Sequence, residues 1–356
     1  MIQYIVRKLF YGFLVLFGVV TLLFFLFNLL PADPARMMLG QRADEEAVAN
    51  LNKELGRDKP LFYQYIKYLN DLSPISIHQK TETAYFSIKS DMQILADFDL
   101  KTCIVAFKLP YLNRSYQSKR PVLQIVNNTL PATFLLAIMA MLFSTVVGIL
   151  LGIASALYKG KFLDHFLSII SVFGMAAPSF FMALIIMWIF GHLLGDFTGL
   201  NRTGSLYVID DLGRGEYIEW KNLILPAFTL GLRPLAVIVQ LTRNSMLDVL
   251  NMDYIRTAKA KGLKRLQVLF KHALKNSLNP VITAISGWLA GLLAGSVFVE
   301  WIFGWKGLGS EIVNALDNYD LPVVMGSVLI IAAMFVIINI LVDIIYGIID
   351  PRVRIN

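Results

Sequence analysis

Charged residues and cysteine are both scarce in this chain. Only 16% of its 356 residues are charged, whereas a soluble domain carries about 25%. Hydrophobic residues make up 56% of the chain, and the mean hydropathy is +0.62. This excess predicts a protein that crosses a membrane several times. Cys103 is the single cysteine, which excludes an internal disulfide and a cysteine-based metal site.

Several motifs that carry chemistry are also missing. There is no GxxxxGK loop followed by Ser or Thr, so any ATP would be hydrolysed by another chain. We expect no charge at mid-depth in any apolar run, which argues against a proton- or sodium-coupled carrier. A membrane enzyme would need a nucleophile, a metal cluster or paired carboxylates at that depth, and we find none. The histidines are scattered and predict no metal site: His78, His165, His192 and His272.

The apolar residues form six runs, and a membrane span needs about 20 such residues. The first run is too long for a signal peptide and is followed by no small-residue cleavage site, so we expect an uncleaved anchor. Pro131 and Pro178 lie in the second and third runs, where each could kink its helix. The predicted spans are residues 9–30, 130–157, 166–194, 223–241 or slightly beyond, 281–303 and 324–349.

Basic residues mark alternate ends of these runs, as cytoplasmic loops do. They include Lys159 and Lys161 after the second run, and Arg352 and Arg354 after the sixth. The intervening short loops are acidic on balance, and we count Glu300 among the outer ones. Both termini are therefore predicted to be cytoplasmic. The net charge of +7 belongs to these loops and does not indicate nucleic acid.

This orientation divides the chain into four parts. Residues 1–30 are the N-terminal cytoplasmic end and the first span. Residues 31–127 lie outside, with an insertion of uncertain fold at about 73–111. Residues 128–350 form the core of the remaining spans, and residues 351–356 are a cytoplasmic tail.

The most informative segment is DYIRTAKAKGLKRLQVLFKHALKNSLNP, which begins at Asp253 between two apolar runs. Its length allows two short helices broken at Gly262. Ala258, Ala260 and Gly262 form a patch of small residues where another protein could approach the backbone closely. A helix held in a partner's groove would let that partner move the spans. By its chemistry alone, a basic loop that only fixes topology would look the same.

Glycines recur at four-residue spacing in two of the spans. Gly148 and Gly152 lie in the second, and Gly287, Gly291 and Gly295 in the fifth. Because small residues let membrane helices approach closely, we expect them to pack helices together. The fifth span could also line a pathway. Trp301, Phe303 and Trp305 fit an aromatic belt at the membrane interface.

The run from Arg243 to Pro280 resembles the membrane subunits of dipeptide and oligopeptide ABC importers, a family that also imports nickel chelates. The resemblance continues through VEWIFGWKGLG, LVDIIYGIIDPRVR, NNTLPATFLLA, LPAFTLG and LPADPAR, so that it extends over nearly the whole chain. The chain departs from the family pattern in three places. Arg256 replaces the usual loop glutamate, Ala32 replaces a glycine, and the outer segment is longer.

The resemblance implies an all-α membrane protein with six transmembrane helices of the type I ABC importer permease fold. It would carry an extracytoplasmic insertion between helices 1 and 2. It implies a permease subunit in the inner membrane, without enzymatic activity, that passes peptides or similar small solutes. A permease for nickel chelates or other small solutes is the alternative, and a stand-alone secondary carrier is less favoured.

Partners and coupling residues follow from the same resemblance. The partners implied are a second permease in a heterodimer, two ABC ATPases, an extracytoplasmic solute-binding protein and membrane lipid. No cofactor and no nucleic acid are implied. The predicted ATPase-coupling loop lies within residues 243–280, and its contact residues are Asp253, Tyr254, Arg256, Thr257, Ala258, Ala260, Lys261 and Gly262.

Overall fold

The computed structural model describes residues 2–29, 34–39, 44–81, 84–210, 213 and 215–349. It separates into two compact units. The core unit comprises Met1–Phe10, Leu130–Ser310 and Ala333–Asn356, and the insertion unit comprises Tyr11–Thr129 and Glu311–Ala332. The predicted tail at residues 351–356 and residues 30–33 of the LPADPAR motif lie outside the described residues.

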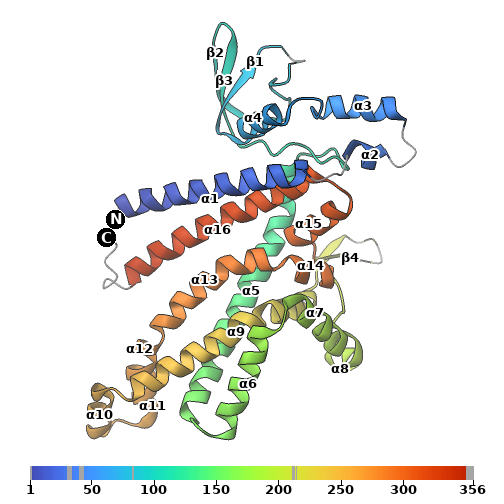
Figure 1. The fold of residues 1–356 in the computed structure, drawn as a ribbon. Coiled ribbons are helices and arrows are strands. Elements are labelled where there is room, and N and C mark those ends of the chain that lie inside the picture. The colour runs from blue at the N-terminus through green and yellow to red at the C-terminus, as the bar shows by residue number, and fades with distance from the viewer. Residues whose placement is uncertain are drawn as a thin grey trace. The chain divides into compact units, whose positions relative to one another are not determined.

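Long apolar helices dominate the chain (Figure 1). Four of them are long and apolar enough to cross a membrane. They are α1 (Ile2–Leu29), α5 (Val122–Leu157), α9 (Lys221–Leu250) and α16 (Leu321–Ile349). Pro131 lies inside α5 without ending it, which membrane helices tolerate. These helices agree with the first, second, fourth and sixth predicted spans.

The third predicted span is not one continuous helix. It consists of α6 (Phe162–Ala176) and α7 (Ser179–Trp188), which continues into the π-helical turn η1 (Ile189–Leu193). The two parts meet at an angle of 115°. Pro178 explains the break, because the residue before a proline is pushed out of the helical conformation, and Ala177 is extended with ψ 133°.

The fifth predicted span is also interrupted. It is formed by α13 (Asn279–Gly295), and the separate short helix α14 (Val297–Phe303) follows it. The helical residues Arg265–Ser277 precede α13 at an angle of 51°. The described residues therefore contain up to six candidate spans, if each bent pair counts as one.

Helix α9 lies at the centre of the core unit. It contacts α6, α7, α13 and α14, and Figure 1 shows it running beside α6. Ile238 of α9 and Leu136 of α5 are fully buried in this core. The hydroxyl of Ser144 on α5 donates to the carbonyl of Gly231 at 2.6 Å, which joins the two helices. The short helix α8 (Gly195–Thr198) and the hairpin of β4 (Tyr207–Ile209) and β5 (Glu216–Ile218) also belong to this unit.

The insertion unit contains a small antiparallel sheet, so the chain is mostly helical but not all-α. The strands β1 (Ile75–Gln79), β2 (Ile94–Asp99) and β3 (Cys103–Lys108) lie in the order β1-β3-β2. All three strands lie within the insertion predicted at 73–111. The unit also holds α2 (Pro34–Leu39), α3 (Glu45–Glu54), α4 (Leu61–Leu72) and most of α15 (Leu308–Asp317).

The two faces of this sheet differ sharply. Ser76, His78 and Lys108 point inward and are buried, and the Lys108 ammonium donates to the backbone oxygen of Asp71 at the end of α4. The opposite face is apolar and exposed. It includes Ile75, Ile77, Phe98 and Phe107, which lie on the same face because side chains alternate along a strand.

Candidate functional site

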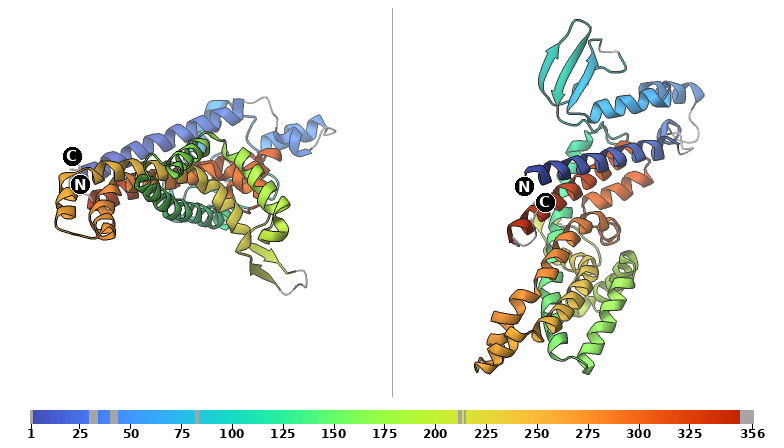
Figure 2. Two further views of the ribbon diagram at one scale, coloured as in Figure 1. Left: turned by 90° about the horizontal axis from the view of Figure 1, so that it is seen from below. Right: turned by 60° about the vertical axis from the view of Figure 1, so that its left-hand side comes forward.

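The predicted coupling segment follows α9 directly. Helix α10 (Asp253–Ala260) ends at a turn where Gly262 has φ +77°, a conformation that glycine adopts without strain. Beyond it lie α11 (Arg265–Gln267), the π-helical turn η2 (Val268–Leu274) and α12 (Lys275–Ser277). Figure 2 shows this orange segment at the end of α9. The structure thus contains the two short helical pieces and the break at Gly262 that the sequence predicts.

One face of α10 packs against the protein's own core. Ile255 is fully buried and Ala258 is 6% exposed, and both lie in a cluster with Met246 of α9 and Val268 and Leu269 of η2. The prediction that Ala258 forms part of an approach surface is therefore wrong. Its small side chain lets α10 lie close to its own chain instead.

The other face of α10 is open. All the other predicted contact residues are exposed there: Asp253, Tyr254, Arg256, Thr257, Ala260, Lys261 and Gly262. Apart from Gly262 and its two chain neighbours, no atom of the described residues lies within 4 Å of where a Cβ on Gly262 would stand. The Tyr254 hydroxyl accepts a hydrogen bond from the Asn276 side chain at 2.9 Å, which joins α10 to α12. The Arg256–Asp253 contact, at 3.5 Å, is exposed and contributes little stability.

Sequence reasoning missed the apolar part of this open face. Leu266 is 68% exposed and Phe270 is 56% exposed, although both are large and apolar. Leu263 beside Gly262 is exposed as well. Exposed apolar side chains among basic residues are typical of a protein contact surface. The missed signal was that Leu266 and Phe270 are four residues apart and so share one helical face. We call Tyr254, Ala260, Leu263, Leu266 and Phe270 the docking face.

A buried ion pair holds α6 to α9 near this segment. Arg243 donates from Nε at 2.5 Å and from Nη2 at 2.8 Å to the two carboxylate oxygens of Asp164. The same carboxylate accepts from the Ser155 hydroxyl at 2.6 Å and from the Gly160 amide at 2.9 Å. The loop between α5 and α6 is therefore tied to α9. Sequence reasoning did not pair these residues, since they are far apart along the chain.

The two predicted glycine sets have different surroundings. A Cβ on Gly148 would lie 2.8 Å from Ile238 Cγ2, and one on Gly152 would lie 2.5 Å from Thr242 Cβ, so α5 approaches α9 closely at both. At Gly287, Gly291 and Gly295 no atom of the described residues beyond the adjacent backbone and neighbours of α13 itself lies within 4 Å of such a Cβ. Within the described residues these three glycines pack against no other helix, because their face of α13 is open, and their predicted packing role stays a prediction.

A charge does lie at mid-depth in one span, against expectation. Arg233 stands between the apolar residues of α9, about 18 Å from its start at 1.5 Å per residue. It is exposed, and within the described residues its guanidinium has no hydrogen bond or ion pair. An arginine at the centre of a membrane helix costs about 2.5–3.5 kcal/mol on insertion scales. The absence of a mid-span charge is therefore no longer an argument against a carrier.

The VEWIFGWKGLG segment forms a compact buried turn. Glu300, expected in an outer loop, is fully buried, and its carboxylate accepts from the Gly309 amide at 2.7 Å and the Ser296 hydroxyl at 2.8 Å. Gly307 lies so close to this carboxylate that a side chain would collide with it. Trp305 and Phe303 are also buried, so the expected aromatic belt is wrong for both and only Trp301 is exposed.

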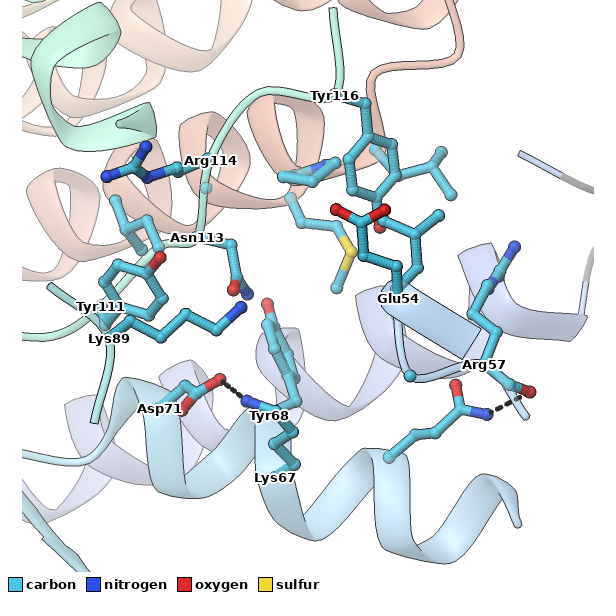
Figure 3. A pocket seen from close by; sticks show the side chains of 18 of the residues that line it. Glu54, Arg57, Lys67, Tyr68, Asp71, Lys89, Tyr111, Asn113, Arg114 and Tyr116 are labelled. Atoms are coloured by element: carbon cyan, nitrogen blue, oxygen red, sulfur yellow. Dashed lines mark hydrogen bonds and ion pairs between the residues drawn. The ribbon is translucent and has the colours of Figure 1, made fainter. Parts of the chain in front are cut away.

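A cavity of about 500 Å³ opens in the insertion unit. In Figure 3, Lys89, Asn113 and Tyr68 converge on one side, and Glu54 and Tyr116 lie on the other. The Lys67 ammonium forms an ion pair with the Asp71 carboxylate at 2.8 Å. Desolvation by the cavity walls, with the nearby charge of Lys67, lowers the pKa of Lys89. Among the described residues no group of His, Cys, Asp and Glu could hold a metal ion.

Comparison with known proteins identifies related chains over the full length. Residues 148–355 match the family described as binding-protein-dependent transport system inner membrane component. Residues 1–137 match the N-terminal family of the same membrane components. The first match includes the docking face, and the second includes the strands β1, β2 and β3.

Curated relatives share about a third of their residues with this chain. A dipeptide transport system permease protein of Alkalihalophilus pseudofirmus is 35% identical, over 99% of this chain and 100% of its own length. A di/tripeptide transport system permease protein of Pseudomonas aeruginosa is 35% identical, over 99% of both chains. A glutathione transport system permease protein of Salmonella paratyphi A is 32% identical, over 99% of both chains.

A solved structure shares the fold. A chain of the MetNI methionine ABC transporter, in an inward-facing conformation, matches with a TM-score of 0.50 and 15% identity. The match covers 64% of this chain and 97% of that one. At this identity the likeness concerns the arrangement of the helices alone.

Proposed function

The chain belongs to the family of binding-protein-dependent transport system inner membrane components, and we propose that it forms the membrane pathway for dipeptides or similarly small solutes. It is a subunit of an ABC importer rather than an enzyme. The docking face at the end of α9 is the observation that carries the mechanism. The names of the dipeptide, di/tripeptide and glutathione relatives support a peptide cargo.

We propose that the docking face binds an ABC ATPase subunit. Leu266 and Phe270 would enter an apolar groove, and Arg256, Lys259 and Lys261 would supply charge at the rim. Movement of the ATPase would reach the spans because Ile255 and Ala258 fix α10 to α9 and η2. The Asp164–Arg243 ion pair would carry the same movement to α6. Two ATPases and a solute-binding protein would complete the importer.

The open glycine face of α13 supports a further partner. Gly287, Gly291 and Gly295 would pack closely against a second, related permease, or would line the pathway between the two subunits. We propose a heterodimer of permeases with six spans in each. The bent pair Phe162–Ala176 and Ser179–Leu193 would serve as one span, and the bent pair Arg265–Ser277 and Asn279–Gly295 as another. Both termini would be cytoplasmic, and the sheet of the insertion unit would lie outside.

The apolar face of that sheet supports a role in binding the solute-binding protein. Ile75, Ile77, Phe98 and Phe107 are each between 47% and 69% exposed. An apolar sheet face of this kind is typical of an interaction surface. We propose that it contacts the solute-binding protein, and that the insertion is not part of the pathway.

A charge placed on the docking face tests ATPase coupling. Ala260→Glu should reduce co-purification of the ATPase and ATP-driven uptake at least tenfold, because a carboxylate would be buried in the contact. Ser118→Glu, which adds the same charge to an exposed site of the insertion unit, is the matched control. Gly262→Glu should act similarly, with Gly262→Ala as the control for backbone strain at φ +77°. Wild-type uptake by Ala260→Glu would contradict the docking face.

Uptake of labelled Ala-Ala by the assembled importer in proteoliposomes tests the cargo. We expect ATP-dependent accumulation that a nickel chelate does not inhibit. Accumulation of the chelate without Ala-Ala would instead support the nickel-chelate alternative.

A further inference from the structure

Arg233 is part of a polar stripe along α9. Successive residues of a helix are 100° apart, so residues seven and eleven positions after Arg233 lie within about 20° of it. These are Gln240 and Asn244, and Asp248 follows on the same side toward the end of the helix. Asn244 and Asp248 are exposed and Gln240 is partly exposed. A stripe of this kind is unfavourable against lipid tails, and it is typical of a face that lines water or another protein.

The opposite face of α9 behaves differently. Ile224 is nine residues before Arg233 and therefore about 180° around the helix. It is 49% exposed and apolar, as a lipid-facing residue would be. Farther along this opposite face Gly231, Ile238 and Thr242 are buried. The exposed polar residues of α9, with the guanidinium, therefore lie on the other side. Pro234, the next residue, is buried and fixes the backbone beside it.

Helix α13 contacts α9 and also has an exposed side, which has small or polar residues instead of large apolar ones. Thr283 and Gly287 are exposed on it, and Gly291 is partly exposed. Two helices in contact therefore each present a polar or small-residue face in the core unit. The faces together supply hydroxyls, amides and open space, but the described residues supply no carboxylate to Arg233. Within the part of the chain that the structure describes, the positive charge at this depth has no counter-ion.

We propose that Arg233 lines the pathway and binds the carboxylate of the cargo as it crosses the membrane. Arginine presents a planar fork of donors that matches a carboxylate with two parallel hydrogen bonds. The ligand class is a small solute with a free carboxylate, such as a peptide with an unblocked C-terminus. This inference rests on the proposed pathway function and adds the residue that recognises the cargo.

Measuring water access at position 233 tests whether Arg233 lines the pathway. This test does not depend on which cargo the importer carries. Arg233→Cys in a Cys103→Ser background should react with a charged, membrane-impermeant thiol reagent in the assembled importer. Ile224→Cys on the opposite face should react at least tenfold more slowly. Equal or slower labelling at position 233 would overturn the inference, even if the importer transports peptides normally.

A comparison of two peptides, one with and one without a free carboxylate, tests whether Arg233 recognises that group. Uptake of Ala-Ala and of its C-terminal amide should be compared in proteoliposomes with one solute-binding protein throughout, so that its own preference cancels in the ratio. Arg233→Gln should lower uptake of Ala-Ala about tenfold relative to the amide, and Arg233→Lys should retain part of the preference. An equal loss for both probes would overturn recognition and indicate that Arg233 pairs with the second permease. If the wild type imports neither probe, the peptide cargo is wrong, and labelling at position 233 still decides its location.

Discussion

At the residue scale, the Glu300 carboxylate organises the turn that follows α14. A buried carboxylate is unfavourable unless donors surround it. Here the amides of Gly309 and Ser310 and the hydroxyl of Ser296 fill that role. The Trp305 indole donates to the carbonyl of Ala132 at 3.0 Å, and so fixes the same turn to α5.

Removal of this carboxylate should destabilise the turn. Glu300→Ala leaves two amides without an acceptor in a buried site, which should cost about 2–4 kcal/mol. Thermal unfolding of the detergent-purified protein measures this loss, with Glu311→Ala as the control on a partly exposed neighbour. A variant as stable as that control would show that the turn does not depend on Glu300.

His78 should make the insertion sensitive to acid. Its Nδ1 faces the Phe86 carbonyl at 3.3 Å and its Nε2 faces the Ser76 hydroxyl at 2.8 Å, which suits a neutral ring. Burial lowers its pKa below the ordinary value of 6.5, and the positive charge of Lys108 adds to this, while Asp71 opposes it. Because the unfolded chain binds the proton more readily, stability should fall as the pH drops below about 6.5, by at most about 1.4 kcal/mol per pH unit.

Hydrogen exchange of the β1 and β3 amides measures this dependence. After correction for intrinsic exchange, protection should decrease from pH 8 to pH 5 in the wild type. In His78→Gln it should change much less over that range. A pH dependence that persists in His78→Gln would assign the effect to another group.

At the element scale, α9 joins the coupling segment to the spans. Its end is fixed by packing of Met246 and Val249 against α10 and η2. Its side is fixed to α6 by the ion pair between Arg243 and Asp164. The Asp164 side chain is 2% exposed and the Arg243 side chain is 24% exposed. A helix held on two sides moves as a rigid body, which suits the transmission of motion.

Loss of Arg243 should therefore loosen α6 from α9. Arg243→Ala leaves a buried carboxylate with only Ser155 and Gly160, which should cost about 2 kcal/mol, less than a fully buried pair because Arg243 is partly solvated. Chemical denaturation measures the cost, with Lys259→Ala as an exposed control. In a double-mutant cycle with Asp164→Asn, additive losses would show that the two side chains do not act as a pair.

At the scale of the whole molecule, the short-loop charges predict which segments face the cytoplasm. Single cysteines at Lys159, Lys264, Lys80 and Asp210, in a Cys103→Ser background, can be probed with an impermeant thiol reagent in intact cells whose outer barrier has been opened. Positions 80 and 210 should react, and positions 159 and 264 should be protected. Labelling of 264 without 210 would contradict the six-span topology.

The insertion should be dispensable for assembly. Its sheet is held through Lys108 and through Tyr85, whose hydroxyl donates to the Gly56 carbonyl at 3.3 Å, and both contacts lie inside the insertion unit. Replacing Ile75–Leu109 with a short Gly/Ser linker should preserve membrane insertion and ATPase binding. Uptake should weaken, and more solute-binding protein should restore it. Failure of the two permeases to assemble would make the segment part of the structural core.

The sequence determined which segments are apolar, where the chain turns at Gly262 and which family it belongs to. Hydropathy and glycine chemistry are local properties, so they can be read without the fold. The break at Pro178 and the three strands of the insertion were harder to predict from the sequence. A long apolar run does not show where it bends, and short strands have weak periodic patterns.

Tertiary structure decided which side of each element is covered. Ala258 and Ala260 are alike in sequence, yet Val268 and Leu269 cover the first and nothing in the described chain covers the second. Glu300 is buried because Gly309 and Ser310 fold back onto it. Such contacts join residues that are separate along the chain, and local periodicity contains no information about them.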